Sequence, residues 1–193
     1  MIRPLILLAA AALSACVPQD GPMRVSGPVQ DIAVQRMRFA VEAVCLNNTT
    51  RAAQDRAARA LDFPIRDREG GAIVYVNPGT LTFLRLGPVP EQAITLEGGQ
   101  QVVYSGPGCS VGSPAVGVSV ANRIAGEILA PRLVDGSALT SAPVGAGRNE
   151  QGGVGFFFED VSLTQPTAQT TITNPTTGQA EAFVHPVILV IHR

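Results

Sequence analysis

Val187-Ile188-Leu189-Val190-Ile191 is the stretch of sequence that decides the fold. Successive side chains of a strand point to opposite faces, so this run makes both faces of a strand apolar. A strand of that kind lies in the middle of a sheet and is covered on both sides. We therefore predict a strand over 180–191 that lies mid-sheet.

Turn-forming residues divide the rest of the chain into further strand candidates. Asn77-Pro78-Gly79 separates two of them, and 174–178 predicts another turn. Gly106-Pro107-Gly108 predicts a break in the chain just before Cys109. The glycine-rich segment 135–153 is expected to form a long loop. The predicted strands cover 72–76, 81–86, 93–96, 101–105, 154–163 and 170–173.

Apolar residues recur at helical spacing in three stretches. The first predicted helix covers 31–46 and has Asp31 as its N-cap. The second covers 50–61, with a threonine cap at its start and Pro64 beyond its end. The third covers 114–129 and is expected to end before Pro131. The first two helices follow one another directly and predict a helical hairpin.

The order of these elements predicts an α+β fold. Residues 30–193 are expected to form a single domain, in which the N-terminal helical hairpin and the mid-chain helix pack on a largely antiparallel sheet. The order of the strands within the sheet does not follow from the pattern.

The N-terminus has the layout of a secretory signal. Arg3 precedes an apolar run over 5–13 that is too short to span a bilayer as a stable helix. Leu13-Ser14-Ala15-Cys16 follows, and it resembles the lipobox of bacterial lipoproteins. The resemblance implies that 1–15 is a signal peptide cut before Cys16, that lipid is attached to this cysteine, and that the new amino group is acylated. Two or more acyl chains anchor a protein stably, whereas one does so only marginally.

Two alternatives for the N-terminus remain open: an ordinary secretory signal with a chance cysteine, and a retained transmembrane helix. Residues 16–29 are rich in proline, glycine and polar residues and are expected to form a flexible tether. Val17 follows Cys16, where an aspartate would resemble an inner-membrane retention signal. Its absence favours the outer membrane, with the domain facing the periplasm. A membrane, reached through lipid on Cys16, is then the first expected partner.

Two cysteines remain besides Cys16, namely Cys45 and Cys109. In an oxidising compartment, the simplest interpretation is one structural disulfide between them. A pair of buried free thiols is the alternative. The two cysteines and two distant histidines lack the spacing of metal ligands, so no metal site and no cofactor are predicted.

The charge balance argues against a nucleic-acid partner. The chain carries 14 basic and 15 acidic residues, and no basic cluster stands out. Phosphate binding needs a concentrated basic face. An envelope protein or a small ligand is the remaining kind of partner.

Gly108-Cys109-Ser110-Val111-Gly112 fits G-x-S-x-G, the nucleophile elbow of α/β-hydrolases. Ser110 would be the nucleophile and His185 the base, with Asp135 or Asp160 between them in the chain. The elbow, however, needs a buried parallel strand before it and repeated strand–helix units around it. The run available before the motif is short, and the chain groups its first helices together and ends in strands. The serine hydrolase is therefore kept as the alternative function.

A short resemblance covers Phe39 to Pro64, where Cys45-Leu46 is followed by an alanine-rich helix that ends in Leu61-Asp62-Phe63. This stretch resembles a group of small, uncharacterised proteobacterial exported proteins. The resemblance brings no activity and no catalytic residues. The leading hypothesis from the sequence is a lipid-anchored protein of the cell envelope whose domain binds or scaffolds another component and is not an enzyme.

Overall fold

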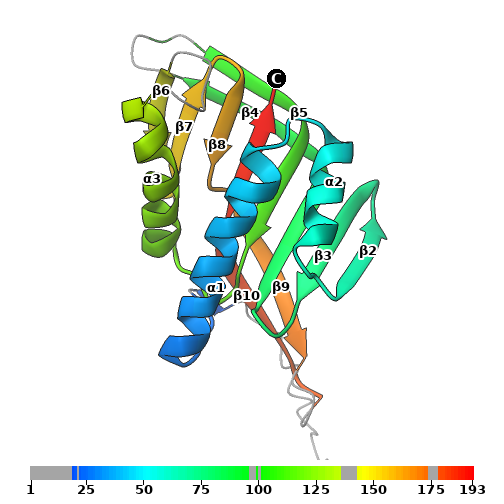
Figure 1. Ribbon diagram of the computed structural model, residues 1–193. Helices are drawn as coiled ribbons and strands as arrows, with labels where there is room; N and C mark the ends of the chain where they lie inside the picture. The colour runs from blue at the N-terminus through cyan, green and yellow to red at the C-terminus, as the bar shows by residue number, and fades with distance from the viewer. Residues whose placement is uncertain (1–18, 21, 96–98, 100, 136–142, 174–177) are drawn as a thin grey trace, which may run out of the picture.

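The computed structural model describes residues 19–20, 22–95, 99, 101–135, 143–173 and 178–193. Within them the chain is α+β, as predicted: three α-helices lie on one face of a largely antiparallel sheet (Figure 1). The sheet has the strand order β2-β3-β4-β5-β10-β8-β7-β6. Its strands are β2 (Ile65–Glu69), β3 (Ala72–Asn77), β4 (Thr82–Thr95), β5 (Gln101–Gly112), β6 (Pro143–Arg148), β7 (Val154–Phe158), β8 (Val161–Thr164) and β10 (Ala180–His192), with β1 (Gln19–Asp20) and β9 (Thr167–Thr173) alongside β10.

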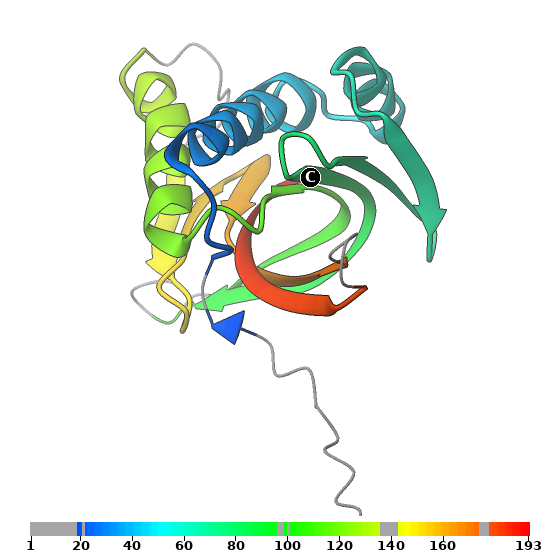
Figure 2. The same cartoon turned by 90° about the horizontal axis from the view of Figure 1, so that it is seen from below.

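The apolar strand β10 lies mid-sheet, which confirms the prediction made from 187–191. This second half of β10 pairs with β5 on one side and with β8 on the other. The first half has different neighbours, because there β10 pairs with β9 and, over two residues, with β1. Seen from below, β10 curves strongly between its two halves, so the lower part of the sheet is trough-shaped rather than flat (Figure 2). One strand therefore serves two sets of partners.

The helices form much as predicted, but their ends differ. Helix α1 (Gly27–Ala40) begins four residues before Asp31, because Ser26 takes the N-cap position and a proline follows in the first turn, where its missing N–H costs nothing. Residues 27–29, which were predicted to be the end of the tether, are therefore the first residues of this helix. The chain continues as a π-helical turn, η1 (Val41–Leu46). Helix α2 (Arg51–Ala60) is capped by Thr50, whose hydroxyl accepts a hydrogen bond from the Ala53 amide at 3.3 Å.

Helix α3 (Val118–Asp135) starts later than predicted and continues past Pro131 rather than ending before it. The proline ring removes one backbone donor, and the helix continues for about one further turn.

The core lies between the helices and the sheet. Alanine and other small side chains of α1, α2 and α3 let these helices approach the strands closely, and larger side chains of the sheet fill the layer. Buried members include Met37, Val44, Tyr75, Leu84, Leu86, Val111, Ile124, Ile128, Leu163, Ile188 and Val190. The predicted disulfide crosses this layer: Cys45 on η1 is bonded to Cys109 on β5, with their Cα atoms 5.4 Å apart.

The strands differ from the prediction in the middle of the chain. Gly106-Pro107-Gly108 does not break the chain, because β5 runs through it and pairs with β4 on both sides of it. Pro88 and Pro107 lie opposite each other in this hairpin, and Gly106 adopts a φ of 136°. The two prolines withhold two backbone donors at one point, and the register of the ladder shifts just beyond it, between Val89 and Gln92, without ending the pairing.

Other strands escaped prediction or are divided differently: β1 lies inside the predicted tether, and the strands predicted over 81–86 and 93–96 form one strand, β4. Strand β2 was not predicted, and β6 lies inside the segment expected to be a loop. The single strand expected over 154–163 is a hairpin of β7 and β8. The turn expected at 174–178 falls largely on 174–177, which lie outside the described residues.

Candidate functional site

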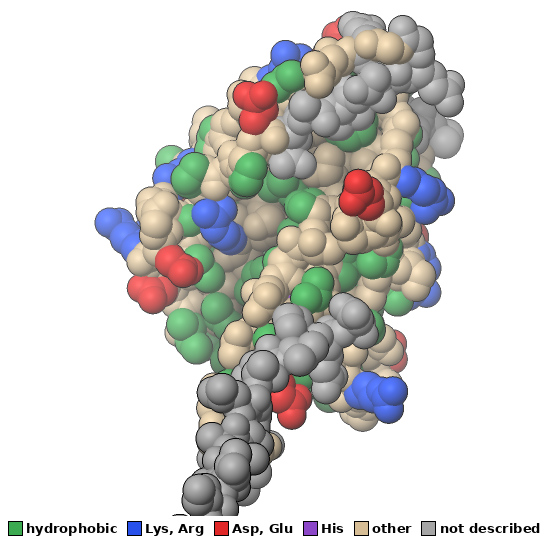
Figure 3. Space-filling view, turned by 180° about the vertical axis from the view of Figure 1, so that it is seen from behind, with side chains coloured by type: hydrophobic (Ala, Val, Ile, Leu, Met, Phe, Trp, Pro, Cys, Tyr) green, Lys and Arg blue, Asp and Glu red, His purple; other side chains and the backbone are tan. Residues whose placement is uncertain are grey.

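A groove of about 560 Å³ lies on the face of the sheet that points away from the helices. Its floor is formed by β3 and β4, and its opposite wall is formed by β9. Apolar side chains reach the surface at several places on this side of the molecule (Figure 3). The lining residues used below are Glu69, Val74, Val76, Phe83, Arg85 and the run 168–173.

The alternation of side chains along β3 and β4 builds the floor. Tyr75 and Leu84 are buried and point into the helix-covered core. Their neighbours Val74, Val76 and Phe83 therefore point to the other face, where they are only partly buried. Apolar residues on both faces of a strand usually mean that both faces are covered. Here one face is covered by helices, and the other forms the floor of the groove.

The wall opposite is β9, which pairs with β10 in register from Thr167 to Thr173. Within the described residues, β9 has no strand on its other side. Its seven residues, Thr-Ala-Gln-Thr-Thr-Ile-Thr, include no charged residue and no proline. A strand edge exposes a row of backbone donors and acceptors. The groove is thus bounded by an apolar floor and by an open strand edge.

His185 fixes β9 to β10 beside this groove. The ring is 2% exposed, and its edge contacts Phe83 of the floor, with ring centroids 5.2 Å apart. Nδ1 lies 3.1 Å from the Pro186 carbonyl, an acceptor, so Nδ1 carries the proton. In the neutral ring Nε2 is then an acceptor, and the Thr170 hydroxyl donates to it at 2.9 Å. Burial lowers the pKa of His185, which the bond to the carbonyl only partly offsets.

Ser110 occupies the middle of antiparallel β5, between Arg85 on β4 and Leu189 on β10. It does not lie at a strand-to-helix turn, which is the position that a nucleophile elbow requires. The two glycines of the motif have a packing role instead. A Cβ on Gly108 would lie 2.6 Å from a Val89 methyl, and one on Gly112 would lie 2.5 Å from the Phe83 ring.

The structure brings Ser110 and His185 to the same sheet but joins them by no hydrogen bond among the described residues. Both ring nitrogens of His185 already have partners in Thr170 and Pro186. The other histidine, His192, donates from Nε2 to the Cys45 carbonyl at 2.8 Å. The side chain of Asp135 lies outside the described residues. No acid–histidine–serine chain therefore forms around Ser110 in the described structure.

The strand at one end of the sheet order, β2, is held against α2 by a charged cluster. Asp55 of α2 accepts hydrogen bonds from Tyr75, from Arg59 at 2.7 Å and from Arg66 of β2 at 3.2 Å. Burial alone would raise the pKa of Asp55, but these hydrogen bonds outweigh it and lower the pKa to about 2. The cluster ties a helix to an edge strand and leaves no free group for chemistry.

A second hollow, of about 550 Å³, lies at the start of β9 and is bordered by Thr167 and by the β6–β7 turn. Gln165 lines it and is 2% exposed. Among the described residues, neither the nitrogen nor the oxygen of its side-chain amide has a hydrogen-bond partner, and the Thr164 hydroxyl beside it has none either. Buried polar groups without partners are rare in folded proteins, so this amide calls for an explanation.

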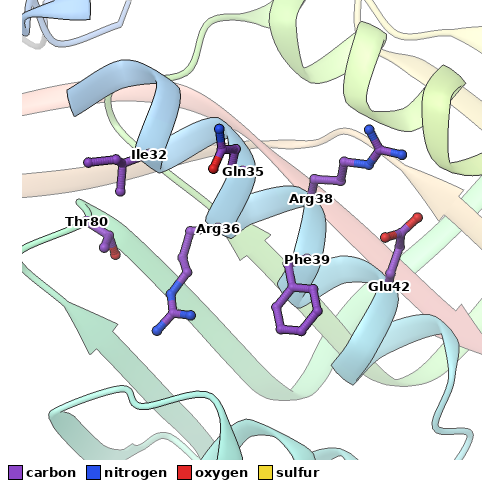
Figure 4. A pocket seen from close by; sticks show the side chains of 7 residues that line it. All are labelled: Ile32, Gln35, Arg36, Arg38, Phe39, Glu42 and Thr80. Carbon is purple, nitrogen blue, oxygen red and sulfur yellow. The ribbon is translucent and has the colours of Figure 1, made fainter. Parts of the chain in front are cut away.

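The outer face of α1 offers a third hollow, shown in Figure 4. Ile32 and Phe39 are 48% and 51% exposed there. Both arginines beside them are engaged within the chain: Arg36 donates to the Leu61 carbonyl at 2.6 Å, and Arg38 pairs with Glu127 at 3.0 Å. In Figure 4, Arg36 and Phe39 point to the side on which Thr80 lies, whereas Arg38 points to the opposite side.

The described residues lack two features. They contain no group of three histidine, cysteine, aspartate or glutamate side chains that is placed to hold a metal ion. Likewise, none of the helices in the described part of the chain has the length and apolar character needed to cross a membrane. Comparison with protein-family models, with curated proteins and with solved structures finds no match for the chain.

The groove was not predicted from the sequence. Its best signal is the combination of an uncharged run at 167–173 with apolar residues at consecutive positions of 73–76. Neither is distinctive without the strand order, because the two segments are far apart in the chain. The residues that the sequence did single out, Ser110 and His185, lie beside the groove floor or wall and hold the fold there.

Proposed function

We propose that this chain is a lipid-anchored protein of the cell envelope whose domain binds another component in the groove between β3, β4 and β9, without catalysing a reaction. The single observation that carries the binding role is the groove itself. It combines an apolar floor, an unpaired strand edge and a volume within the usual range of ligand sites.

The anchoring part of the proposal rests on the lipobox-like Leu13-Ser14-Ala15-Cys16. Cys16 precedes Gln19 by three residues, and three residues span at most about 11 Å. Gln19 pairs with Phe183 in the first half of β10, the strand that also carries β9. Lipid on Cys16 would therefore hold the membrane close to the end of the molecule on which β9 and the groove lie.

The non-catalytic part rests on how the candidate catalytic groups are used. Ser110 lies mid-strand, His185 is occupied by two hydrogen bonds, and the two cysteines are bonded to each other. Disulfide bonding removes the thiol nucleophile. We expect no labelling of the purified chain by a fluorophosphonate probe. Labelling that disappears in Ser110→Ala would restore the serine hydrolase as the function.

Membrane attachment is tested with Cys16→Ala. We expect the wild-type chain to incorporate labelled palmitate and to sediment with outer membranes, and the variant to do neither. The matched control is Cys16 retained with Val17→Ala, which leaves the lipidated residue in place. A variant that still takes up fatty acid and stays in the membrane pellet contradicts the anchor.

Groove binding is tested with an environment-sensitive dye, 1-anilinonaphthalene-8-sulfonate, on the Cys16→Ala chain, which keeps every described residue. Val76→Asp places a charge on the apolar floor and is expected to abolish the fluorescence gain of the native protein. Asp67→Asn, on the neighbouring strand and outside the lining, is the control and is expected to bind the dye normally. Dye binding that is unchanged by Val76→Asp would show that the groove is not the site.

A further inference from the structure

We propose that the groove takes an extended peptide segment, which pairs its backbone with the outer edge of β9 and adds a strand to the sheet. The inference rests on the proposed function and names the class of ligand for the same site. Strand addition of this kind draws its affinity from main-chain hydrogen bonds and its specificity from pockets for alternate side chains.

The first argument is the orientation of β9. Six consecutive residues, 168–173, border the groove. Only every second side chain of a strand points to one face, so a run of six consecutive residues borders the space with its backbone as well as with its side chains. Within the described residues this edge has no partner strand. The edge of β9 is about 20 Å long and offers its backbone donors and acceptors to the groove.

The second argument is that β9 lacks the features that normally prevent such pairing. Edge strands are usually protected by charged side chains, by proline or by a bulge. None of these occurs between Thr167 and Thr173, and the pairing with β10 is regular throughout. An unprotected edge of this length, placed beside an apolar floor, is a template for one more strand.

The third argument is the floor. A strand added to β9 presents alternate side chains to one face, and Val74, Val76 and Phe83 lie on the floor opposite β9. Apolar side chains at every second position of the peptide would rest on them. Glu69 and Arg85 bring one charge of each sign to the same groove, so the floor does not favour a strongly charged ligand.

The fourth argument favours a peptide over a lipid acyl chain. Thr167, the first residue of β9, borders the hollow that contains the unpartnered amide of Gln165. A ligand that follows β9 beyond its first residue reaches that hollow. The free donor and the free acceptor of the glutamine amide match a peptide group, which offers one of each. An acyl chain would leave both without partners.

The probe is a set of fluorescein-labelled peptides as long as β9. They carry valine, isoleucine or phenylalanine at alternate positions, threonine or serine between them, and a lysine at each end for solubility. Binding to the Cys16→Ala chain is followed by fluorescence anisotropy. The tightest binder is then remade twice, with N-methyl groups on its odd-numbered or on its even-numbered residues. A paired strand turns alternate amides toward its partner, so one series is expected to lose binding by tenfold or more, at about tenfold per hydrogen bond removed, and the other to retain it.

Three protein variants complete the test. Thr171→Lys adds to β9 the kind of charge that protects other edges, at a position whose side chain is exposed, and is expected to weaken the peptide by about tenfold. Gln165→Leu is expected to weaken the peptide while leaving the melting temperature unchanged or higher, since it removes an unpartnered polar group. Ser105→Lys, an exposed position of β5 outside the lining, is the matched control and is expected to have no effect.

The outcomes separate the two proposals. Equal effects of the two N-methyl series, or full binding by Thr171→Lys, overturn strand addition. If no peptide of the set binds but oleate displaces the dye from the native chain, the groove is a lipid site, and only the inference is wrong. If neither peptide, dye nor oleate binds, the proposed function is wrong as well.

Discussion

The two edges of the sheet at β2 and β9 are built in opposite ways. Strand β2 carries four charged residues in succession, Arg66 to Glu69, and is tied to α2 through Asp55. Strand β9 carries none and is held by β10 and by one hydrogen bond to His185. The first edge repels an additional strand, and the second admits one. The difference indicates where the molecule excludes partners and where it is open to one.

Removal of the disulfide is expected to have the largest effect on stability and to affect both edges. Cys45 and Cys109 are 64 residues apart, and removing a crosslink that closes such a loop costs about 4 kcal/mol in the chain-entropy model. We expect Cys45→Ala with Cys109→Ala to lower the free energy of unfolding by an amount of that order, measured by urea denaturation. Hydrogen exchange is expected to rise at β2 and β9 alike. A rise confined to one edge would mean that the disulfide supports that edge rather than the whole core.

Asp55→Asn is expected to weaken the β2 edge alone. The pKa of Asp55 is lowered to about 2, so its carboxylate stabilises the folded state above the ordinary pKa, and this stabilisation is lost as the pH falls from about 4 to 2. One pKa unit corresponds to about 1.4 kcal/mol, which puts the loss at pH 7 at about 2 kcal/mol. The measurement is urea denaturation at pH 7 and at pH 2.5, with exposed Asp31→Asn as the control. Faster hydrogen exchange in β9 of the Asp55→Asn variant would show that the two edges are not independent of each other.

His185 is expected to give the β9 edge a response to pH that has the same direction as that of Asp55 but sets in at a higher pH. The pKa of His185 is lowered in the folded state, so the unfolded chain takes up the proton first, and stability falls as the pH drops below the ordinary histidine pKa. The free energy of unfolding changes by at most about 1.4 kcal/mol per pH unit through this group. Between pH 7 and pH 5, the protection factors of the β9 amides, which correct for the slower intrinsic exchange at lower pH, are expected to fall before those of the β2 amides. His185→Gln should remove this part of the pH dependence, while His192→Gln should keep it.

The smallest expected effect comes from the cap of α2. Thr50→Ala removes the side-chain acceptor for the Ala53 amide, which costs about 1 kcal/mol. Because α2 carries Asp55, fraying of its first turn is expected to loosen β2 slightly and to leave β9 unchanged. The check is thermal unfolding, with Thr49→Ala as the control. An equal effect of the two substitutions would show that the cap has no energetic role.

The sequence predicted those elements whose pattern is local. The apolar run 187–191 indicated a central strand, because both of its faces had to be covered. The two cysteines allowed only one pairing within the predicted domain, and the structure confirms it. Helix α2 followed from its threonine cap and from its alanine spacing.

The missed elements depend on contacts between distant parts of the chain. Strand β2 has no apolar alternation, since its charged residues are stabilised by α2 and β3 rather than by burial. Gly106-Pro107-Gly108 has the composition of a turn, yet β4 supplies a partner that keeps it extended. The groove depends on the bend of β10, which brings β9 opposite β3, and the strand order that produces it was not predicted.

The same missing strand order explains why Ser110 drew attention. G-x-S-x-G names a turn only when a helix follows directly, and here the two glycines accommodate neighbouring side chains of a continuous strand. A pattern of small residues does not distinguish these two causes. The relevant information lies in Val89, Phe83 and Leu189, which occupy the space that a Cβ would need.

The place of β10 in the strand order also constrains the sequence of events in folding. Strands β2 to β5 form one set of consecutive hairpins and β6 to β8 another, and both sets precede β10 in the chain. Among the described strands, only β10 pairs its backbone with both sets, between β5 and β8. A side-chain hydrogen bond also joins the sets, from the Tyr104 hydroxyl of β5 to the Phe158 carbonyl of β7. Until it inserts, the chain holds two partial sheets whose inner edges are unpaired, and contacts of such large sequence separation form slowly. Closing the sheet is therefore a late event, and it completes the bent strand on which β9 rests.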